Sequence, residues 1–574
     1  MYKGIGASKG YGIGRAVIYK EADLKYEKKS GCDPKEQKER LEKALETFFS
    51  RNEALHKKAA KTAGDAAAEI IMGHIMMMKD PYMCSEIEKL IDSGKCAEEG
   101  VETVCDTFIA MFSSVDDEMT RQRAADVRDI KKEMLSILLG IQTVDLSNLP
   151  KDTVLVAEEL TPSMTACIDK SNVVGFVTEV GSKTSHAAIL ARAMEIPAVL
   201  SLKNACEVIK SDQLTVVDGV KGEVITEPSN DVTAEYIRLR VDFDKEKAAL
   251  KKFAGKETVT ADGQKVMLFA NIGTPDDALK VSEYDGEGIG LFRTEFLFMD
   301  RTSAPDEQEQ FEAYKKALTV MKGKTVVIRT LDVGGDKDIP YMNLEKEENP
   351  FLGFRAVRYC LKNSEFYKTQ LRALLRAGVY GDLWIMVPLV TGVDELRAVK
   401  ALLSQAKSEL ESEGVSYKKD IKVGVMIETP AAALTADIFA KEADFFSIGT
   451  NDLTGYTMAA DRGNANVAYL YSPFNPSVLR SIKYIISEAK KAGITVGMCG
   501  EGAADPMLIP LLISFGLDEY SVTPTSVLAT RREISKWSKA DADEIADRVM
   551  SLSTEREVVS ELERAAAQKD NGPS

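Results

Sequence analysis

Arginine, acidic and thiol residues follow short apolar segments throughout the second half of the chain. These candidates are Arg293, Arg329, Glu428, Asn451, Asp452, Arg462 and Cys499. Guanidinium groups match the oxygens of phosphates and carboxylates, and carboxylates are hard ligands that suit Mg²⁺. One strand-end arginine or one loop glutamate is commonly only paired or solvated. Together, the residue types predict a site for a small polyanion and a divalent metal ion, with Glu428 and Asp452 as metal ligands.

A second candidate centre is His186, in the sequence VGSKTSHAAILARAMEIP. A loop of Gly, Ser, Lys and Thr leads into His186 at the first turn of a predicted helix. The exposed backbone N–H groups and the helix dipole at such a position favour an anion beside the imidazole. This pattern favours a phosphorylated histidine. The alternative is that Thr184 or Ser185 simply caps the helix, which must be true in part.

The first set of residues requires a scaffold that brings several strand ends together. From 256 to 574, apolar runs alternate with helical segments. The runs are VMLFANIG, GIGLFRTEF, TVVIRTLD, LWIMVPLV, VGVMIETP, FFSIGTND, TVGMCGE and YSVTP. Eight strand–helix units predict a (β/α)8 TIM barrel, whose active sites are built at the carboxyl ends of the strands. The candidate residues lie at those ends.

The N-terminal half predicts a different organisation, in a multidomain α/β protein. Residues 1–20 and 144–228 carry short strand-like runs, so we expect one α/β domain made from both segments. Residues 21–143 contain almost no proline and show helical periodicity, which predicts an inserted helical bundle. Residues 229–255 form a charged amphipathic segment that predicts a linker helix.

Composition limits the functional classes. The chain has 574 residues, 44% of them hydrophobic and 29% charged, with a net charge of −16. An acidic chain has no overall field to attract nucleic acid or anionic lipid. No signal peptide and no run of about 18 apolar residues is present, so we expect a cytoplasmic protein. The eight cysteines show no metal-binding spacing and are expected to be reduced thiols.

Several long blocks resemble Enzyme I, the phosphoenolpyruvate-protein phosphotransferase family of bacterial sugar phosphotransferase systems. They are GIGASKG, HIMMMKDP, RAADVRDI, LTPSMTA, TSHAAILARAMEIPA, GLFRTEFLFMDR, RTLDVGGDK, EENPFLGFRA, ETPAA, FFSIGTNDLT, DRGN and MCGE. The resemblance runs nearly end to end, and so many blocks in one order are highly specific. Departures from the usual family pattern occur at Lys9, Ser182, Gly455, Tyr469, Asn475 and Gly502.

The resemblance implies that His186 carries the phosphoryl group on Nε2, within a swivelling domain. It assigns phosphoenolpyruvate to Arg293, Arg329, Asn451, Asp452 and Arg462, and Mg²⁺ to Glu428 and Asp452. Cys499 would protonate the enolate to give pyruvate, because a thiol near its usual pKa of about 8.5 stays largely protonated at neutral pH. The family further implies a homodimer through the barrel and docking of the histidine phosphocarrier protein HPr on the helical insertion.

Two alternatives come from other functional classes. An ATP-dependent phosphoenolpyruvate synthase or dikinase shares the histidine domain and barrel. Such enzymes need an additional nucleotide-binding domain, for which the region before His186 has no Walker-type loop and no room. A catalytically silent regulatory relative would have lost the histidine, the thiol or an arginine, and all of these are present.

Overall fold

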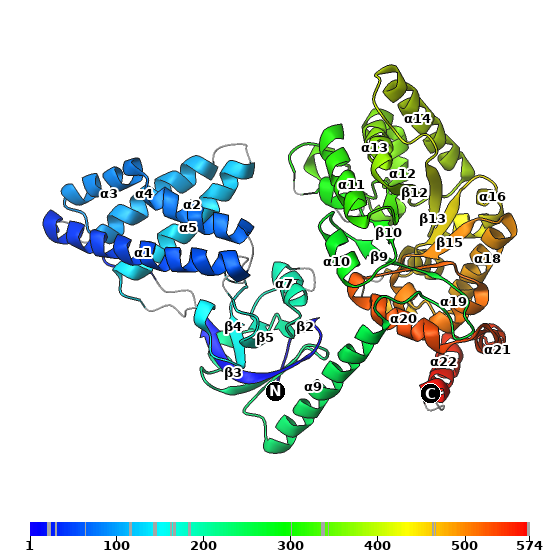
Figure 1. Ribbon diagram of the computed structural model, residues 1–574, viewed down its shortest axis with the longest axis horizontal. Coiled ribbons are helices and arrows are strands. Elements are labelled where there is room, and N and C mark those ends of the chain that lie inside the picture. Colours follow the sequence, from blue (N-terminus) through cyan, green and yellow to red (C-terminus); the bar gives the residue numbers. More distant parts are fainter. Residues whose placement is uncertain are drawn as a thin grey trace. The chain divides into compact units, whose positions relative to one another are not determined.

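The computed structural model describes residues 1–19, 24–28, 31–62, 65–113, 118–141, 146–160, 164, 168–181, 185–299, 301–334, 339–342, 344–461, 464 and 466–570. The chain divides into two compact units, Met1–Glu246 and Lys247–Ser574, each described by itself (Figure 1).

An eight-stranded sheet in the first unit combines strands from both of its ends. The strands are β1 (Tyr2–Lys3), β2 (Ile5–Ser8), β3 (Tyr11–Tyr19), β4 (Thr153–Ala157), β5 (Val173–Thr178), β6 (Ala198–Leu200), β7 (Leu214–Asp218) and β8 (Glu223–Thr226). Their order is β1-β8-β7-β3-β4-β5-β6-β2. Strand β3 pairs in parallel with β4 and antiparallel with β7, so the opening segment lies in the middle of the sheet. This confirms an α/β domain built from both flanks of the helical segment.

Glycines allow β3 to approach its neighbours closely. A Cβ on Gly14 would lie 1.9 Å from the carbonyl oxygen of Asp152, and one on Gly12 would lie 2.1 Å from that of Val174. Each face of the sheet has its own apolar core, as the alternation of side chains along a strand requires. Leu155 packs on one face with helix α7 (His186–Met194), and Val154 packs on the other with helix α8 (Ala205–Val208).

The inserted segment is helical, as the sequence predicts. Its helices are α1 (Pro34–Thr62), α2 (Asp65–Met78), α3 (Pro81–Asp92), α4 (Ala97–Ser113) and α5 (Glu118–Leu138). They share an apolar core that includes Phe48, Met78, Ile87 and Val127. The bend between α2 and α3 is fixed by Asp80, whose side chain accepts hydrogen bonds from the backbone N–H groups of Tyr82 and Met83.

The predicted linker helix is α9 (Asn230–Leu250), which runs across the division between the two units. Most of its residues are exposed. Tyr236 is its buried residue, and the Tyr236 hydroxyl donates to Asp218 at 3.2 Å.

In the second unit, parallel strands close into a barrel in the order β9 to β16. The strands are β9 (Met267–Ile272), β10 (Ile289–Phe292), β11 (Thr325–Arg329), β12 (Asp382–Val387), β13 (Lys422–Ile427), β14 (Phe445–Ile448), β15 (Thr495–Met498) and β16 (Glu519–Val522). Each overlaps one of the eight predicted strand-like runs, with β12, β13 and β16 beginning one residue before theirs, which confirms the TIM barrel.

Helices surround this barrel (Figure 1). They are α10 (Asp277–Glu283), α11 (Glu307–Met321), α12 (Val357–Lys362), α13 (Ser364–Ala377), α14 (Val393–Ser412), α15 (Pro430–Leu434), α16 (Ala436–Phe439), α17 (Thr450–Met458), α18 (Pro476–Ala492), α19 (Ile509–Phe515), α20 (Val527–Lys536), α21 (Lys539–Met550) and α22 (Glu555–Asp570). Alternate strand residues face the helices, where the main core forms. The others point inward and form a small inner cluster with Leu291, Val327, Met426 and Cys499. Among the described residues, no helix combines the length and apolarity needed to cross a membrane.

Candidate active site at the barrel mouth

The barrel places most of the predicted residues at one end. Arg329 is the last residue of β11, and Arg293, Glu428 and Cys499 directly follow β10, β13 and β15. Asn451 and Asp452 lie in the first turn of α17, just after β14. Because all the strands are parallel, these positions share the carboxyl end of the barrel. Arg462 lies outside the described residues.

One carboxylate connects two buried arginines at this mouth. Asp332 Oδ2 lies 2.9 Å from Arg329 Nη1, and Asp332 Oδ1 lies 2.7 Å from Arg355 Nη2. The other side of Arg329 faces Glu295, with Nη2 and Oε1 2.9 Å apart. Burial lowers the pKa of Arg329, but the charges of Glu295 and Asp332 outweigh burial and raise it. Arg329 therefore stays charged in its buried position.

Arg355 belongs to the site but is not among the residues predicted from the ends of strands. It lies just before α12, far along the chain from the end of β11. Its Nη2 lies 3.7 Å from Asp452 Oδ2, so it connects Asp332 to the residues after β14. The backbone around it is unusual: Ala356 has φ 52°, and a Cβ on Gly334 would lie 2.4 Å from the Cβ of Arg355. Glycine at 334 is required for this close approach. The sequence signal was the block FLGFRA, which contains Arg355.

Glu428 is a buried carboxyl at the centre of the mouth. Its Oε1 accepts a hydrogen bond from the backbone N–H of Leu389 at 2.7 Å, and Leu389 adopts a left-handed φ of 53°. Burial and the charges of Asp452 and Asp332 raise the pKa of Glu428 to about 8, although Arg329 acts in the opposite direction. A cation beside Glu428 and Asp452 would relieve this repulsion and favour the ionised carboxylate.

The carboxylates of Glu428 and Asp452 suit Mg²⁺ better than they suit a metal ion that needs all of its ligands from the protein. Mg²⁺ is typically bound by one or two carboxylates and keeps its other positions for water and substrate phosphate. Among the described residues, no group of three or more His, Cys, Asp or Glu side chains could hold a metal ion. A Mg²⁺ ion beside Glu428 and Asp452 would take its remaining ligands from water and substrate.

Cys499 is a buried thiol, 3% exposed, in the inner apolar cluster. Its Sγ lies 3.8 Å from the carbonyl oxygen of Ile448. Burial raises the pKa of Cys499 to about 12, and the neighbouring Ser447 hydroxyl acts against it. This pKa is higher than the value of about 8.5 assumed from the sequence, so the thiol holds its proton more firmly than expected.

Asn451 and Arg293 complete the described part of the mouth. The Asn451 Oδ1 atom accepts from the backbone N–H of Glu501 at 3.5 Å, and its backbone oxygen accepts from the Tyr471 hydroxyl at 2.9 Å. The Arg293 side chain is exposed. The arrangement combines fixed cations, two acidic oxygen ligands and a protonated thiol, which is the set needed to bind a phosphorylated carboxylate and transfer a proton to carbon.

His186 belongs to the other unit, where it is the first residue of α7. Ser185 caps this helix, its Oγ accepting from the backbone N–H of Ala188 at 3.4 Å. Ala187, Ala188 and Ala191 of this helix are buried in the apolar core of the domain. The side chain of His186 lies outside the described atoms. The capping alternative for Ser185 is thus confirmed, and it is compatible with an anion at the same helix start.

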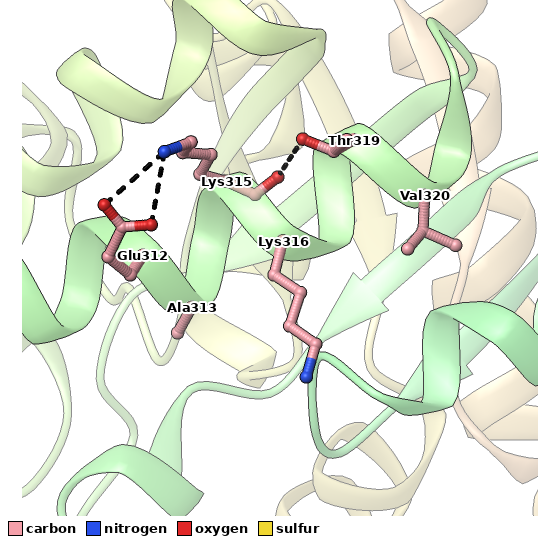
Figure 2. Close-up of a pocket in the computed structure, with 6 residues that line it drawn as sticks. All are labelled: Glu312, Ala313, Lys315, Lys316, Thr319 and Val320. Atoms are coloured by element: carbon pink, nitrogen blue, oxygen red, sulfur yellow. Dashed lines mark hydrogen bonds and ion pairs between the residues drawn. The ribbon is translucent and has the colours of Figure 1, made fainter. Parts of the chain in front are cut away.

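Two surface cavities lie elsewhere. Figure 2 shows one of about 470 Å³ along α11, lined by Glu312, Ala313, Lys315, Lys316, Thr319 and Val320. There Lys315 pairs with Glu312 at 3.2 Å, and Lys316 points away and pairs with Asp276 at 2.6 Å. The other, of about 560 Å³, is lined partly by Met267 and Asp518 at the opposite, amino-terminal end of the strands. Neither contains a predicted site residue.

Comparisons with known proteins match all three regions of the chain. Residues 3–123 match the family described as PEP-utilising enzyme, N-terminal, residues 149–222 its mobile domain, and residues 247–539 its PEP-binding domain. A Priestia megaterium protein named phosphoenolpyruvate-protein phosphotransferase is 48% identical over 558 residues, covering 97% of each chain. One of the same name from Bacillus subtilis (strain 168) is 46% identical over 558 residues, covering 97% of this chain and 98% of that protein. The solution structure of a protein described as Enzyme I (nEIt) is 34% identical, with a TM-score of 0.40, and covers 42% of this chain and 100% of that one.

The raised pKa of Glu428 predicts a pH-dependent stability in metal-free protein. Between pH of about 4.5 and 8 the folded state binds a proton that the unfolded state has lost, so the free energy of unfolding should fall as pH rises through this window. Glu428→Gln stays neutral and should reduce the slope, measured by thermal unfolding in EDTA. Added Mg²⁺ should stabilise the wild type at pH 8 more than this variant.

The exposed Glu411 provides the control, because Glu411→Gln removes a carboxylate that lies on the surface in α14. Its pH slope should equal that of the wild type. An unchanged slope in Glu428→Gln would show that the carboxyl is ionised without a metal.

Proposed function

The chain belongs to the phosphoenolpyruvate-protein phosphotransferase family, and from this premise we propose how its residues divide the reaction between the two units. The observation that carries the proposal is the pair Arg329 and Arg355, both held by Asp332 beside Glu428 and Asp452. In the proposed reaction, His186 attacks the phosphorus of phosphoenolpyruvate. The bond from phosphorus to the enol oxygen breaks, a phosphorus–nitrogen bond forms, and the enolate of pyruvate remains.

The substrate is held by arginines and amide groups at the barrel mouth. Arg293, Arg329 and Arg462 face the phosphate and carboxylate charges, and Asn451 and Asp452 bind beside them. Arg355, absent from the set inferred from sequence, adds a fixed guanidinium to this group. Mg²⁺, held by Glu428 and Asp452, would supply positive charge to the phosphoryl oxygens as the bond breaks.

Cys499 completes the reaction by giving its proton to carbon three of the enolate, which yields pyruvate and a thiolate. The thiolate then takes a proton from water. The high pKa of the buried thiol supports this role, because the group is fully protonated when the enolate forms. A thiolate of such high pKa is also strongly basic, so its reprotonation is favourable.

The second transfer passes the phosphoryl group from His186 to the carrier protein HPr. We place its docking surface on the helical insertion, residues 21–143. Exposed apolar side chains on α2 support this assignment: Met72 and Met76 are 38% and 66% exposed and lie one helical turn apart, whereas Met78 is fully buried. Exposed methionines adapt to the shape of a partner surface.

The two transfers require motion of the histidine domain. Phosphoryl transfer needs contact between donor and acceptor atoms within a few ångströms, so His186 cannot face both the barrel mouth and the carrier in one arrangement. We therefore propose that the α/β domain, residues 1–20 and 144–228, swivels between them, with α9 as the linker.

We also propose a homodimer through the barrel unit, residues 256–574. Leu434 on α15 and Ile438 on α16 are 76% and 41% exposed, and Tyr484 on α18 is 38% exposed. These three helices contact one another, so the apolar side chains lie within one region of the barrel surface. Burial in a dimer would remove them from water.

His186→Ala should abolish phosphoryl transfer completely, because the variant lacks the nucleophile. Binding of phosphoenolpyruvate and Mg²⁺ at the barrel should remain, which isothermal titration calorimetry can measure. Labelled phosphoenolpyruvate should leave no label on this variant, whereas the same exchange at His56 should leave transfer intact. Normal labelling of His186→Ala, or label entering only with ATP, would overturn the assignment.

Cys499→Ala should still accept the phosphoryl group on His186 but form pyruvate slowly, because the proton donor is missing. Cys499→Ser should recover little activity, since a hydroxyl is a much weaker acid. The measurement is the rate of pyruvate formation together with the stereochemistry of hydrogen addition at carbon three. Wild-type rate and stereochemistry in the alanine variant would show that Cys499 only packs in the barrel interior and donates no proton.

Met76→Glu should weaken transfer to HPr by about tenfold or more, because it places a charge in an apolar contact. Phosphorylation by phosphoenolpyruvate should be unchanged. Val220→Glu puts the same charge at a site 48% exposed in the α/β domain and is the control. Equal carrier kinetics in all three proteins would argue against docking on α2.

Leu434→Glu should shift the protein from dimer to monomer, as measured by sedimentation velocity over a concentration series. Leu279→Glu is the matched control, because Leu279 on α10 is 54% exposed in the same unit. If Leu279→Glu dissociates the dimer and Leu434→Glu does not, the interface lies elsewhere on the barrel.

A further inference from the structure

Glu519 is a buried acidic residue inside the barrel that the proposed reaction does not use. It begins β16, opposite Gly497 of β15, and is 6% exposed. A Cβ on Gly497 would lie 1.8 Å from Glu519 Oε2, so the carboxyl fills the space that a side chain at 497 would occupy. Gly497 precedes Cys499 by two residues, and the two positions face the same side of the strand. The carboxyl therefore lies in the layer next to the thiol.

A chain of hydrogen bonds leads from this layer to the backbone of Cys499. Asn271 Nδ2 donates to the carbonyl oxygens of Cys499 at 3.0 Å and Ser521 at 3.1 Å. Its Oδ1 must therefore act as the acceptor, and it receives the hydroxyl of Ser521 at 2.5 Å. The Ser521 oxygen has given its only proton to Asn271, and its lone pairs remain available for another donor.

The Glu519 carboxyl is the neighbouring group that could supply such a proton. A Cβ on Gly290 would lie 2.2 Å from Glu519 Oε1 and 2.4 Å from Ser521 Oγ, so both oxygens share the space in front of this glycine. No donor among the described residues is aimed at Glu519 Oε1. A carboxylate there would be buried without a partner for this oxygen, whereas a protonated carboxyl can donate to Ser521.

The surroundings favour the protonated form. Burial, followed by the charge of Asp518, raises the pKa of Glu519 to about 8, while the neighbouring Ser521 hydroxyl acts in the opposite direction. Asp518 itself is paired with Lys490 and accepts from the backbone N–H of Val496 at 3.0 Å. The inward positions of β10 and β15 beside the carboxyl are the glycines, which bring no charge. These surroundings favour the protonated carboxyl near neutral pH.

We propose that Glu519, as a neutral acid, is a positioning residue for Cys499. Its proton completes the chain through Ser521 and Asn271 that holds the carbonyl group of Cys499. The chain fixes the strand end, so the thiol approaches carbon three of the enolate from one side only. This inference rests on the proposed role of Cys499 as proton donor.

The test compares two replacements of similar size. Glu519→Gln keeps a donor, because its amide can donate to Ser521, whereas Glu519→Leu cannot. Phosphoenolpyruvate labelled stereospecifically at carbon three is converted in D₂O, and the chirality of the pyruvate methyl group is measured. Glu519→Leu should lose about tenfold or more in the rate of stereospecific protonation and give partly racemic methyl groups. Glu519→Gln should stay within about twofold of the wild type.

Ser521→Ala breaks the same chain at its next link and is the second variant. It should show the defect of Glu519→Leu, and the double variant should be no worse than either single one. The KM for phosphoenolpyruvate and the first-turnover phosphorylation of His186 should be unchanged in all of them. If Glu519→Leu does not fold, Ser521→Ala and Glu519→Gln still decide the question.

Wild-type stereochemistry in both Glu519→Leu and Ser521→Ala would overturn the proposal. An equal defect in Glu519→Gln and Glu519→Leu would also overturn it. That result would indicate that Glu519 itself donates a proton in the reaction and does not act by positioning Cys499. Cys499→Ala is measured in parallel. If Cys499→Ala protonates the enolate with full stereospecificity, Cys499 is not the proton donor. If Cys499→Ala loses stereospecificity while the Glu519 and Ser521 variants keep it, Cys499 remains the donor and only the positioning role of Glu519 is rejected.

Discussion

The contact of Asp332 with both Arg329 and Arg355 is the constraint on which the barrel mouth depends. Two guanidinium groups in a buried site repel each other and lose their hydration. Neutral neighbours do not offset the free energy of either effect. Asp332 lies between them with both of its oxygens engaged, and Glu295 supports the far side of Arg329. The arginines are therefore already oriented before an anion arrives. Binding does not have to order them, which favours the bound and reacting states alike.

The acidic groups of the barrel interior fall into two kinds because their neighbours differ. Asp332 and Glu295 lie against the guanidinium groups of Arg329 and Arg355. Glu428 and Glu519 are buried, with the charges of other carboxylates nearby, so both hold a proton more firmly than an exposed glutamate. The same side-chain chemistry thus supplies counter-ions, a potential metal ligand and a neutral hydrogen-bond donor within one barrel.

Much of this arrangement is predictable from sequence, for identifiable reasons. Parallel strands covered by helices are buried on their outer face, so they appear as short apolar runs, and all eight were found. Arg329, Glu428 and Cys499 are polar or reactive residues directly at the ends of such runs. Arg355 and Asp332 are different, because they lie in the long connection after β11 and meet only through tertiary contacts.

Glu519 escaped sequence analysis for another reason. An acidic residue at the start of a strand is usually solvated, and only the absence of side chains at Gly290 and Gly497 shows that the barrel has room for it. A glycine in an apolar run does not indicate, from the sequence alone, which side chain will fill the space next to it. The roles of His186 and Arg462 rest on sequence resemblance, since their side chains lie outside the described part of the chain.

The central place of β3 in its sheet has a consequence for how the chain acquires its structure. This strand is made early, yet its partners β4 and β7 follow only after the entire helical segment. Until then the backbone N–H and C=O groups of β3 cannot pair with these strands, whereas the helices between can form from local contacts. The sheet therefore closes late, by contacts between segments well over a hundred residues apart, and such pairing is slow because a long loop must first be closed. During synthesis, the unpaired β3 is the part of the first unit most exposed to aggregation.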